Sequence, residues 1–164
     1  MSVPIRAAVI TASDACSRGE RADDSGAALV ELLEASGAEI VERKILSDDL
    51  APLVQTLEEI AGRSDVNLIL TTGGTGLGPR DNTPEAMLQV IEREAPGIAE
   101  AIRAESLKVT PMAMISRGVA GVASGTLIIN FPGSPKAVRE SFAVIKPVLA
   151  HAVDLLAGKT RHNQ

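Results

Sequence analysis

The sequence is poor in aromatic residues and has a negative net charge. It contains no Trp and no Tyr, and Phe131 and Phe142 are its only aromatic rings apart from two histidines. Hydrophobic residues still make up 45% of the chain, so the core must be aliphatic. Proteins that bind single strands stack bases on aromatic side chains, and a net charge of −5 opposes binding to a polyanion. Nucleic acid is therefore excluded as the main partner.

Cysteine is also scarce, because Cys16 is the only one and no internal disulfide can form. No charged and then apolar leader precedes Ile5. The apolar runs are shorter than the roughly 20 residues that a membrane span needs. We therefore expect a cytoplasmic protein that does not contact a membrane.

Short apolar runs alternate with helical patterns in the first half of the chain. Strands are predicted at residues 5–12, 40–46 and 66–71, and helices at residues 26–36 and 50–61. This βαβαβ order is typical of a parallel sheet with helices on both faces. A chain of 164 residues fits one domain. We predict a single α/β domain with a doubly wound, mostly parallel sheet over residues 1–157, and a disordered tail at residues 158–164.

The second half is predicted to hold fewer strands and three helices. Thr83 can cap a helix with Pro84 at its first position, and Pro96-Gly97 would break it and start another. We expect a pair of short strands around residues 116–118, within the stretch 112–122. A final strand at residues 126–131 then leads into a long helix that ends at Leu156.

Four polar loops follow apolar strands and should meet at one edge of the sheet. Ligands of doubly wound sheets bind in the crevice outside the carboxyl ends of the strands. The four loops are Ser13-Asp14, residues 47–49, residues 71–86 and residues 130–134.

The loop TTGGTGLGPRDNTPEA at residues 71–86 is rich in glycine. It is not a Walker A loop, because no lysine follows its last glycine, and Pro79 breaks the dinucleotide pattern GxGxxG. Gly73, Gly74 and Gly76 can nevertheless let the backbone approach an anion closely. A glycine-rich turn without a ligand is the alternative.

Two cations stand where a helix is predicted to begin. Ser134 is a suitable N-cap, with Pro135 at the first helical position and Lys136 in the first turn, where the helix dipole disfavours a cation. Arg80 precedes another helix start in the same way. Either could be a solvated surface charge, but together they favour a polyanionic ligand such as a nucleotide.

Asp48 and Asp81 follow strand ends and are candidates to hold Mg²⁺, which proteins bind through one or two carboxylates plus substrate oxygens. Each could instead be a turn or capping residue, and for Asp49 we prefer that interpretation. Cys16, His151 and His162 are too scattered for a zinc site or a Cys-His nucleophilic pair.

Four motifs in order resemble one enzyme family over nearly the whole chain. TTGGTGLGPRDNTPEA, EREAPG, ESLKVTPMAMISRGVAG and TLIINFPGSPKAV resemble the molybdopterin adenylyltransferases, which include bacterial MogA and MoaB-type proteins and the G domains of plant Cnx and gephyrin. The resemblance implies a homotrimer that transfers AMP from ATP to molybdopterin with Mg²⁺, releases pyrophosphate and hands its product to a molybdate insertase.

The resemblance also implies site residues. Its essential aspartates fall on Asp48 and Asp81, which would be catalytic and would hold the metal. The substrate-binding positions are Ser13, Asp14, Thr72, Gly73, Gly74, Thr75, Gly76, Ser106, Ser116, Asn130, Pro132, Gly133 and Ser134. Arg80 joins them as a possible counter-charge.

Two other functions are weighed against the adenylyltransferase. The related insertase domain normally sits in a chain more than twice this long. A non-catalytic molybdopterin-binding or scaffold protein of the same fold is the second alternative, and the presence of Asp48 and RDNTPEA weighs against it.

Overall fold

The computed structural model describes residues 1–160 and contains six strands. They are β1 (Arg6–Ala12), β2 (Glu39–Leu46), β3 (Leu68–Thr72), β4 (Arg93–Glu94), β5 (Ala120–Ala123) and β6 (Thr126–Phe131). The helices are α1 (Asp14–Ser17), α2 (Asp24–Ala35), α3 (Leu50–Ala61), α4 (Thr83–Val90), α5 (Pro96–Leu107), the 3₁₀ helix η1 (Pro111–Ile115) and α6 (Pro135–Leu156).

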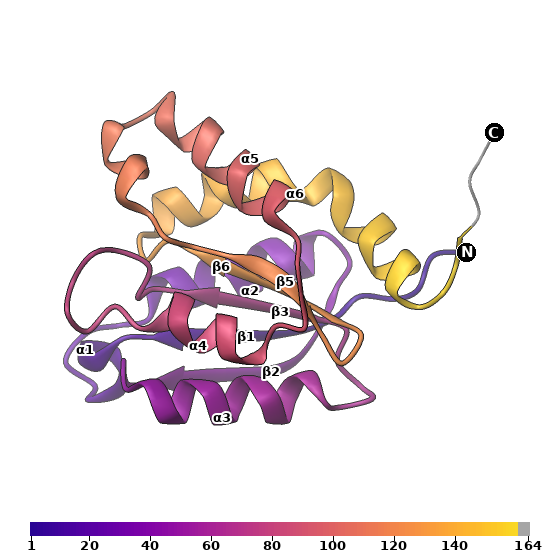
Figure 1. Ribbon diagram of the computed structural model, residues 1–164, viewed down its shortest axis with the longest axis horizontal. Helices are drawn as coiled ribbons and strands as arrows, with labels where there is room; N and C mark the ends of the chain where they lie inside the picture. Colours follow the sequence, from indigo (N-terminus) through magenta and orange to yellow (C-terminus); the bar gives the residue numbers. More distant parts are fainter. Residues whose placement is uncertain (161–164) are drawn as a thin grey trace.

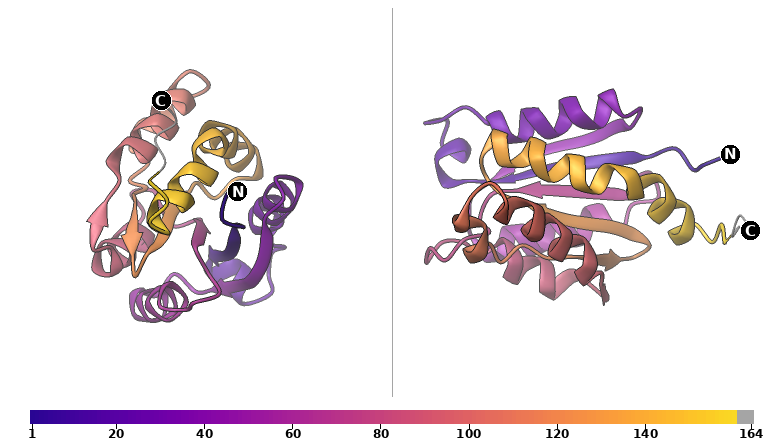
Figure 2. Two further views of the ribbon diagram at one scale, coloured as in Figure 1. Left: turned by 90° about the vertical axis from the view of Figure 1, so that its right-hand side faces the viewer. Right: turned by 90° about the horizontal axis from the view of Figure 1, so that it is seen from above.

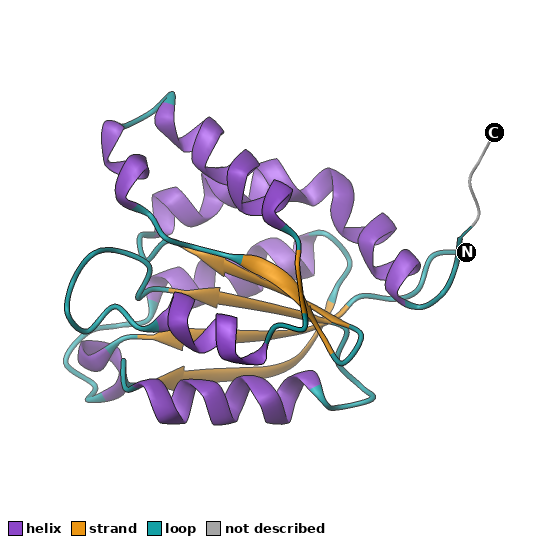
Figure 3. Ribbon diagram, viewed as in Figure 1, coloured by secondary structure: helices purple, strands orange, loops and turns teal. Residues whose placement is uncertain are grey.

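All six strands form one sheet in the order β2-β1-β3-β6-β5-β4. Strands β2, β1, β3 and β6 are parallel to one another, while β5 runs antiparallel to both β6 and β4. Figure 1 shows the parallel strands ending on its left side, and Figure 3 shows that loops cluster there. The predicted single α/β domain with a mostly parallel sheet is confirmed.

Helices cover both faces of the sheet, as the edge-on view in Figure 2 shows. On one face, α2, α5 and α6 bury residues such as Leu29, Ile102 and Phe142 against the strands. On the other face, α3 and α4 contribute Leu57 and Met87 to a second core cluster. Strands buried on both faces read as continuous apolar runs, which is why β1, β3 and β6 were predicted to within two residues.

The described residues contain no helix that is long and apolar enough to cross a membrane. The predicted disordered tail falls largely on residues 161–164, which lie outside the described part of the chain. In the described part, the Lys159 ammonium donates a hydrogen bond to the carbonyl oxygen of Met1.

The segment between α5 and β6 differs from its prediction. The expected pair of strands is one strand, β5, preceded by the 3₁₀ helix η1. Thr110 caps this helix by accepting a hydrogen bond from the Met112 amide, and Pro111 fits its first position. The Thr110 cap and Pro111 therefore favour a 3₁₀ helix where the residues that follow them predicted a strand.

Helix α4 begins at Thr83, but Thr83 does not cap it as predicted. Asn82 occupies the N-cap position without a capping bond, and the Thr83 hydroxyl donates to the Gly73 carbonyl at 2.9 Å. At the other predicted start, the Ser134 hydroxyl accepts a hydrogen bond from the Ala137 amide, so the N-cap of α6 is confirmed.

Candidate functional site

Two aspartates are hydrogen-bonded to each other where β1 and β2 end. The Asp14 amide donates to Oδ2 of Asp48 at 2.9 Å, and the Asp48 amide donates to Oδ1 of Asp14 at 3.0 Å. Burial raises the pKa of the Asp48 carboxyl, and the charges of Asp14 and Asp81 raise it further. The structure thus brings Asp14, Asp48 and Asp81 into one electrostatic cluster.

Arg80 is paired with acids of the protein. Its guanidinium donates to both carboxylate oxygens of Asp14, at 2.8 and 3.0 Å, and lies 2.9 Å from Oδ1 of Asp49. The hydrogen bonds from Arg80 and from the Asp48 amide lower the pKa of Asp14 to about 2. Arg80 therefore closes the glycine loop onto the ends of β1 and β2.

Asp49 fits the turn interpretation but not the capping one. It occupies the N-cap position of α3 without a capping hydrogen bond, while its Oδ2 accepts from the Ser47 hydroxyl at 3.0 Å and its amide donates to that hydroxyl. Its Oδ1 also pairs with Arg80. Lys136 lies 3.7 Å from the carboxylate of Glu140, one helical turn further along α6.

Asp81 sits on the turn just before α4. Its Oδ2 accepts a hydrogen bond from the Gly78 amide at 2.8 Å, and its amide donates to the Gly78 carbonyl. A Cβ on Gly76 would lie 2.9 Å from the same Oδ2. Glycine at this position therefore leaves room for the Asp81 carboxylate.

The backbone conformation at positions 73 and 74 requires glycine. Both have positive φ, at 92° and 67°, which L-residues adopt only with strain. A Cβ would overlap with the Ala12 carbonyl at Gly73 and with the Thr83 hydroxyl at Gly74. Close packing explains these two glycines without a ligand, so their predicted binding role stays a prediction.

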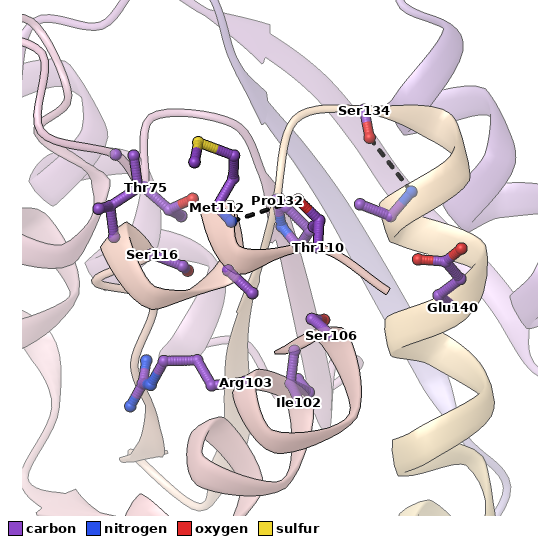
Figure 4. Close-up of a pocket in the computed structure, with 14 residues that line it drawn as sticks. Thr75, Ile102, Arg103, Ser106, Thr110, Met112, Ser116, Pro132, Ser134 and Glu140 are labelled. Atoms are coloured by element: carbon purple, nitrogen blue, oxygen red, sulfur yellow. Dashed lines mark hydrogen bonds between the residues drawn. The ribbon is translucent and has the colours of Figure 1, made fainter. Parts of the chain in front are cut away.

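A cavity of about 300 Å³ opens beside the glycine loop (Figure 4). Its wall comes from the loop, α5, η1 and the start of α6. Six predicted site residues line it, namely Thr75, Gly76, Ser106, Ser116, Pro132 and Ser134. Ile102, Met112, Ala113 and Ile115 supply apolar surface, which suits a planar organic ring.

A second cavity of about 280 Å³ lies on the other side of the β6–α6 turn. Ser13, Gly73, Gly133 and Ser134 line it, together with Cys16 and Arg21. Arg21 donates to the Ser13 hydroxyl at 3.1 Å. Ser134 borders both cavities, so the N-terminus of α6 stands between them.

Thr72 and Asn130 lie behind the cavities. Thr72 is fully buried and donates to the Pro132 carbonyl at 2.7 Å. Asn130 donates from Nδ2 to the Thr71 hydroxyl and accepts from the Val119 amide. Their side chains hold neighbouring strands and turns together, so the structure supports a positioning role for both.

Sequence reasoning missed Arg117, which follows Ser116 in the ISR motif. Its guanidinium donates to the carbonyls of Gly76 and Asp81 at 2.7 and 2.8 Å and pairs with Glu85. This interaction lowers the pKa of Glu85. The only sequence signal was a lone cation between a small polar residue and a glycine.

The acids fit the oxygen chemistry that Mg²⁺ prefers. Residues 1–160 hold no group of three His, Cys, Asp or Glu side chains arranged for a metal. Mg²⁺ needs only one or two carboxylates when substrate oxygens and water complete its shell. The negative surroundings that raise the pKa of Asp48 also favour a cation there.

Comparison with known proteins places the chain in a family. The family model described as a probable molybdopterin binding domain matches residues 8–151. A Helicobacter pylori protein named molybdopterin adenylyltransferase is 38% identical over 156 residues, which are 94% of this chain and 89% of that protein. The Drosophila melanogaster molybdenum cofactor synthesis protein cinnamon is 44% identical over 149 residues.

Solved structures of similar proteins support the same family. The molybdopterin biosynthesis enzyme MoaB from Thermus thermophilus has a TM-score of 0.88 at 46% identity, covering 94% of this chain and 98% of that one. The Mog protein from Mycobacterium ulcerans has the same TM-score at 39% identity, covering 96% and 99%. The chain matches 25% of the length of cinnamon and 23% of Dictyostelium discoideum gephyrin. This chain belongs to the molybdopterin-binding domain family that includes the molybdopterin adenylyltransferases.

Proposed function

We propose that this chain transfers AMP from ATP to the terminal phosphate of molybdopterin and releases pyrophosphate. The observation that carries the proposal is the convergence of Asp48, Asp81 and the glycine loop beside a cavity with an apolar wall. Several relatives named molybdopterin adenylyltransferase, at 36% to 38% identity, support it.

The cavity lined by Ser106 and Ser116 takes the pterin, whose ring can lie against its apolar wall while the hydroxyls bind its polar edge. The N-terminus of α6 and the amides of residues 74–76 would bind the phosphates, whereas the Gly73 amide donates to the Phe131 carbonyl. This arrangement puts two anionic substrates against positive ends of backbone dipoles, which lowers their mutual repulsion.

Asp48 and Asp81 would hold Mg²⁺ against the triphosphate. When bound, the metal supplies charge neutralisation for the phosphate oxygens. The chain's own residues position the reactants: an oxygen of the pterin phosphate forms a bond to the α-phosphorus of ATP, and the bond from that phosphorus to the pyrophosphate oxygen breaks. No side-chain nucleophile is needed. The Cys16 thiol donates to the Ala22 carbonyl at 3.7 Å, and His151 lines a hollow together with Met1 and Lys159.

The test is to mix the protein with molybdopterin and Mg-ATP and to measure adenylated pterin and pyrophosphate. Asp81→Asn is expected to keep pterin binding and to lose pyrophosphate release. Near-normal turnover of Asp81→Asn would refute the assigned role. Tight pterin binding without any adenylated product from the unmodified chain would favour the non-catalytic binding or scaffold function.

We further propose a homotrimer, as the resemblance implies. Five large apolar side chains between residues 107 and 115 are exposed, and such patches are typical of contact surfaces. They are Leu107, Val109, Met112, Met114 and Ile115. Light scattering tests the assembly state. Hand-over of the product to a molybdate insertase and a cytoplasmic location, which the single cysteine supports, also stay predictions.

A further inference from the structure

Arg117 stands between the wall of the cavity that Ser106 and Ser116 line and the loop that carries Asp81. The chain just before it lines the cavity through Met112, Ala113 and Ser116. Its own amide donates to the carbonyl of Thr75 at 2.8 Å. The cavity wall and the glycine loop are therefore joined at this residue by the main chain as well as by the side chain.

The Arg117 guanidinium reaches acceptors on both sides of the Asp81 turn. Nε donates to the Gly76 carbonyl at 2.7 Å, Nη2 donates to the Asp81 carbonyl at 2.8 Å, and Nη1 pairs with the Glu85 carboxylate at the start of α4. A planar guanidinium can make all these bonds at once, whereas an ammonium cannot match their fixed directions. One side chain thus spans the loop from its glycine end to its helix end.

The tip of this turn is exposed to solvent. Leu77, Gly78, Pro79 and Arg80 are exposed, so the turn buries little apolar surface. Asp81 bonds to Gly78 within the turn, and Arg80 ties the outer side of the turn to Asp14 and Asp49. At the base of the loop, Asn82 donates to the Asp48 carbonyl and Thr83 donates to the carbonyls of Gly73 and Gly74. Of the two arginines, Arg117 is the one that contacts the backbone of Asp81 itself.

We propose that Arg117 is a positioning residue that fixes the Asp81 carboxylate relative to the cavity. Its guanidinium is engaged by protein acceptors, so it acts through Asp81 and not on substrate. The inference rests on the proposed function, in which the Asp81 carboxylate takes part in AMP transfer. A shift of about 1 Å in such a group can cost about 100-fold in rate.

The test compares Arg117→Gln with Arg63→Gln. Arg63 is a matched control, since it also pairs with carboxylates and its side chain is 36% exposed against 34% for Arg117. It pairs with Glu42 and Asp65, away from both cavities beside the glycine loop. Arg117→Gln is expected to lower kcat for AMP transfer by about 10- to 100-fold while the Kd for molybdopterin changes less than about threefold. Arg63→Gln should leave both unchanged. Equal kcat in the two variants would overturn the proposal.

Amide hydrogen exchange provides a readout that does not depend on catalysis. Peptides covering residues 73–85 should exchange faster in Arg117→Gln than in the unmodified chain, and Arg63→Gln should leave them unchanged. Unchanged exchange in Arg117→Gln would overturn the tether. If the unmodified chain forms no adenylated pterin, the proposed function fails, while this measurement still decides whether Arg117 holds the loop.

A second background separates positioning from general stability. In Asp81→Glu the carboxylate is already displaced, so adding Arg117→Gln should lower kcat by less than it does in the unmodified chain. Equal losses in the two backgrounds would mean that Arg117 acts independently of Asp81. Should Arg117→Gln fail to fold, Arg117→Lys and Glu85→Gln remove only part of the bond set and should give smaller changes in the same direction.

Discussion

Asp14 and Asp48 hold each other through their main-chain amides, yet their carboxylates lie in opposite electrostatic surroundings. Each amide donates to the other residue's carboxylate, at 2.9 and 3.0 Å. The Asp14 carboxylate then faces Arg80, whereas the Asp48 carboxylate is half-buried beside two other acids. The two aspartates at one sheet edge therefore differ in how readily each carboxyl ionises.

The two carboxyls should titrate in separate pH ranges. Arg80 and the Asp48 amide lower the pKa of Asp14 to about 2, while burial and the neighbouring acids raise the pKa of Asp48 above 3.8. Asp14 therefore stabilises the fold above its unfolded pKa of about 3.9, and this contribution is lost as the pH falls towards 2. Asp48 has the opposite sign: its ionised form opposes folding, and protonation relieves this as the pH falls through its raised pKa.

Carboxyl carbon chemical shifts, followed by NMR against pH, would measure both values. Arg80→Gln is the control and should bring the pKa of Asp14 back up towards the ordinary range. An Asp48 carboxyl that titrates at lower pH than Asp14 would contradict the prediction.

Replacing Asp48 with Asn should abolish AMP transfer and increase stability. The amide oxygen can still accept from the Asp14 amide, while the penalty for a half-buried charge near Asp14 and Asp81 disappears. We expect the free energy of unfolding at pH 7 to rise by about 0.5 kcal/mol, because removing a charge that opposes folding is commonly stabilising. Urea unfolding would measure it.

Asp65→Asn serves as the control for that measurement. Arg63 lowers the pKa of Asp65, so the charged form is favoured and the variant should gain no stability. A midpoint for Asp48→Asn below that of the unmodified chain would show that the Asp48 charge is stabilising after all.

The sheet could be predicted because its buried strands and capped helices leave local signals. Gly37 follows α2 with a φ of 83°, as a helix-ending glycine does, and Ser134 caps α6. The two-residue strand β4 left no such pattern, because Arg93 and Glu94 are exposed and are defined only by pairing with β5. Element order was readable from the chain, but short edge pairing depends on tertiary contacts.

The site was predictable to the extent that parallel topology gathers strand-end loops. It was not predictable which charges would pair, since Arg80 and Asp14 are 66 positions apart and either could have faced solvent. The role of Arg117 depends on carbonyl groups, which every residue has and no sequence pattern reveals. Side-chain chemistry could be inferred from residue types, whereas backbone acceptors required the fold.

Replacing Thr72 with Val should destabilise the turn that borders both cavities. Val has a similar shape but cannot donate to the Pro132 carbonyl, which would lose its 2.7 Å hydrogen bond. The Thr72 side chain is fully buried. We expect a loss of about 1–2 kcal/mol in the free energy of unfolding, measured with urea.

Thr56→Val is the matched control, because Thr56 is also a buried threonine but lies on α3, away from the turn and both cavities. It should cost less than about 0.5 kcal/mol. Equal losses in the two variants would mean that the Thr72 hydroxyl does not hold the turn.

Gly73→Ala and Gly37→Ala separate two reasons for glycine. Both positions have positive φ, at 92° and 83°, so alanine is strained at each and should cost about 1–2 kcal/mol. At Gly37 a Cβ meets nothing within 4 Å, so the cost should stop there. At Gly73 the Cβ would overlap with the Ala12 carbonyl at the end of β1.

Because a backbone atom cannot move aside as a flexible side chain can, Gly73→Ala must push the glycine loop away from β1. The loss of unfolding free energy should therefore reach about 3 kcal/mol or more, and urea unfolding of both variants would measure the difference. The same displacement would move Thr83, which donates to the Gly73 carbonyl, and with it the start of α4 after Asp81. Gly73→Ala should accordingly lower AMP transfer even under conditions where the variant is fully folded, whereas Gly37→Ala should not. Equal unfolding free energies for the two variants would show that Gly73 is needed only for its backbone conformation and that close packing against β1 plays no part.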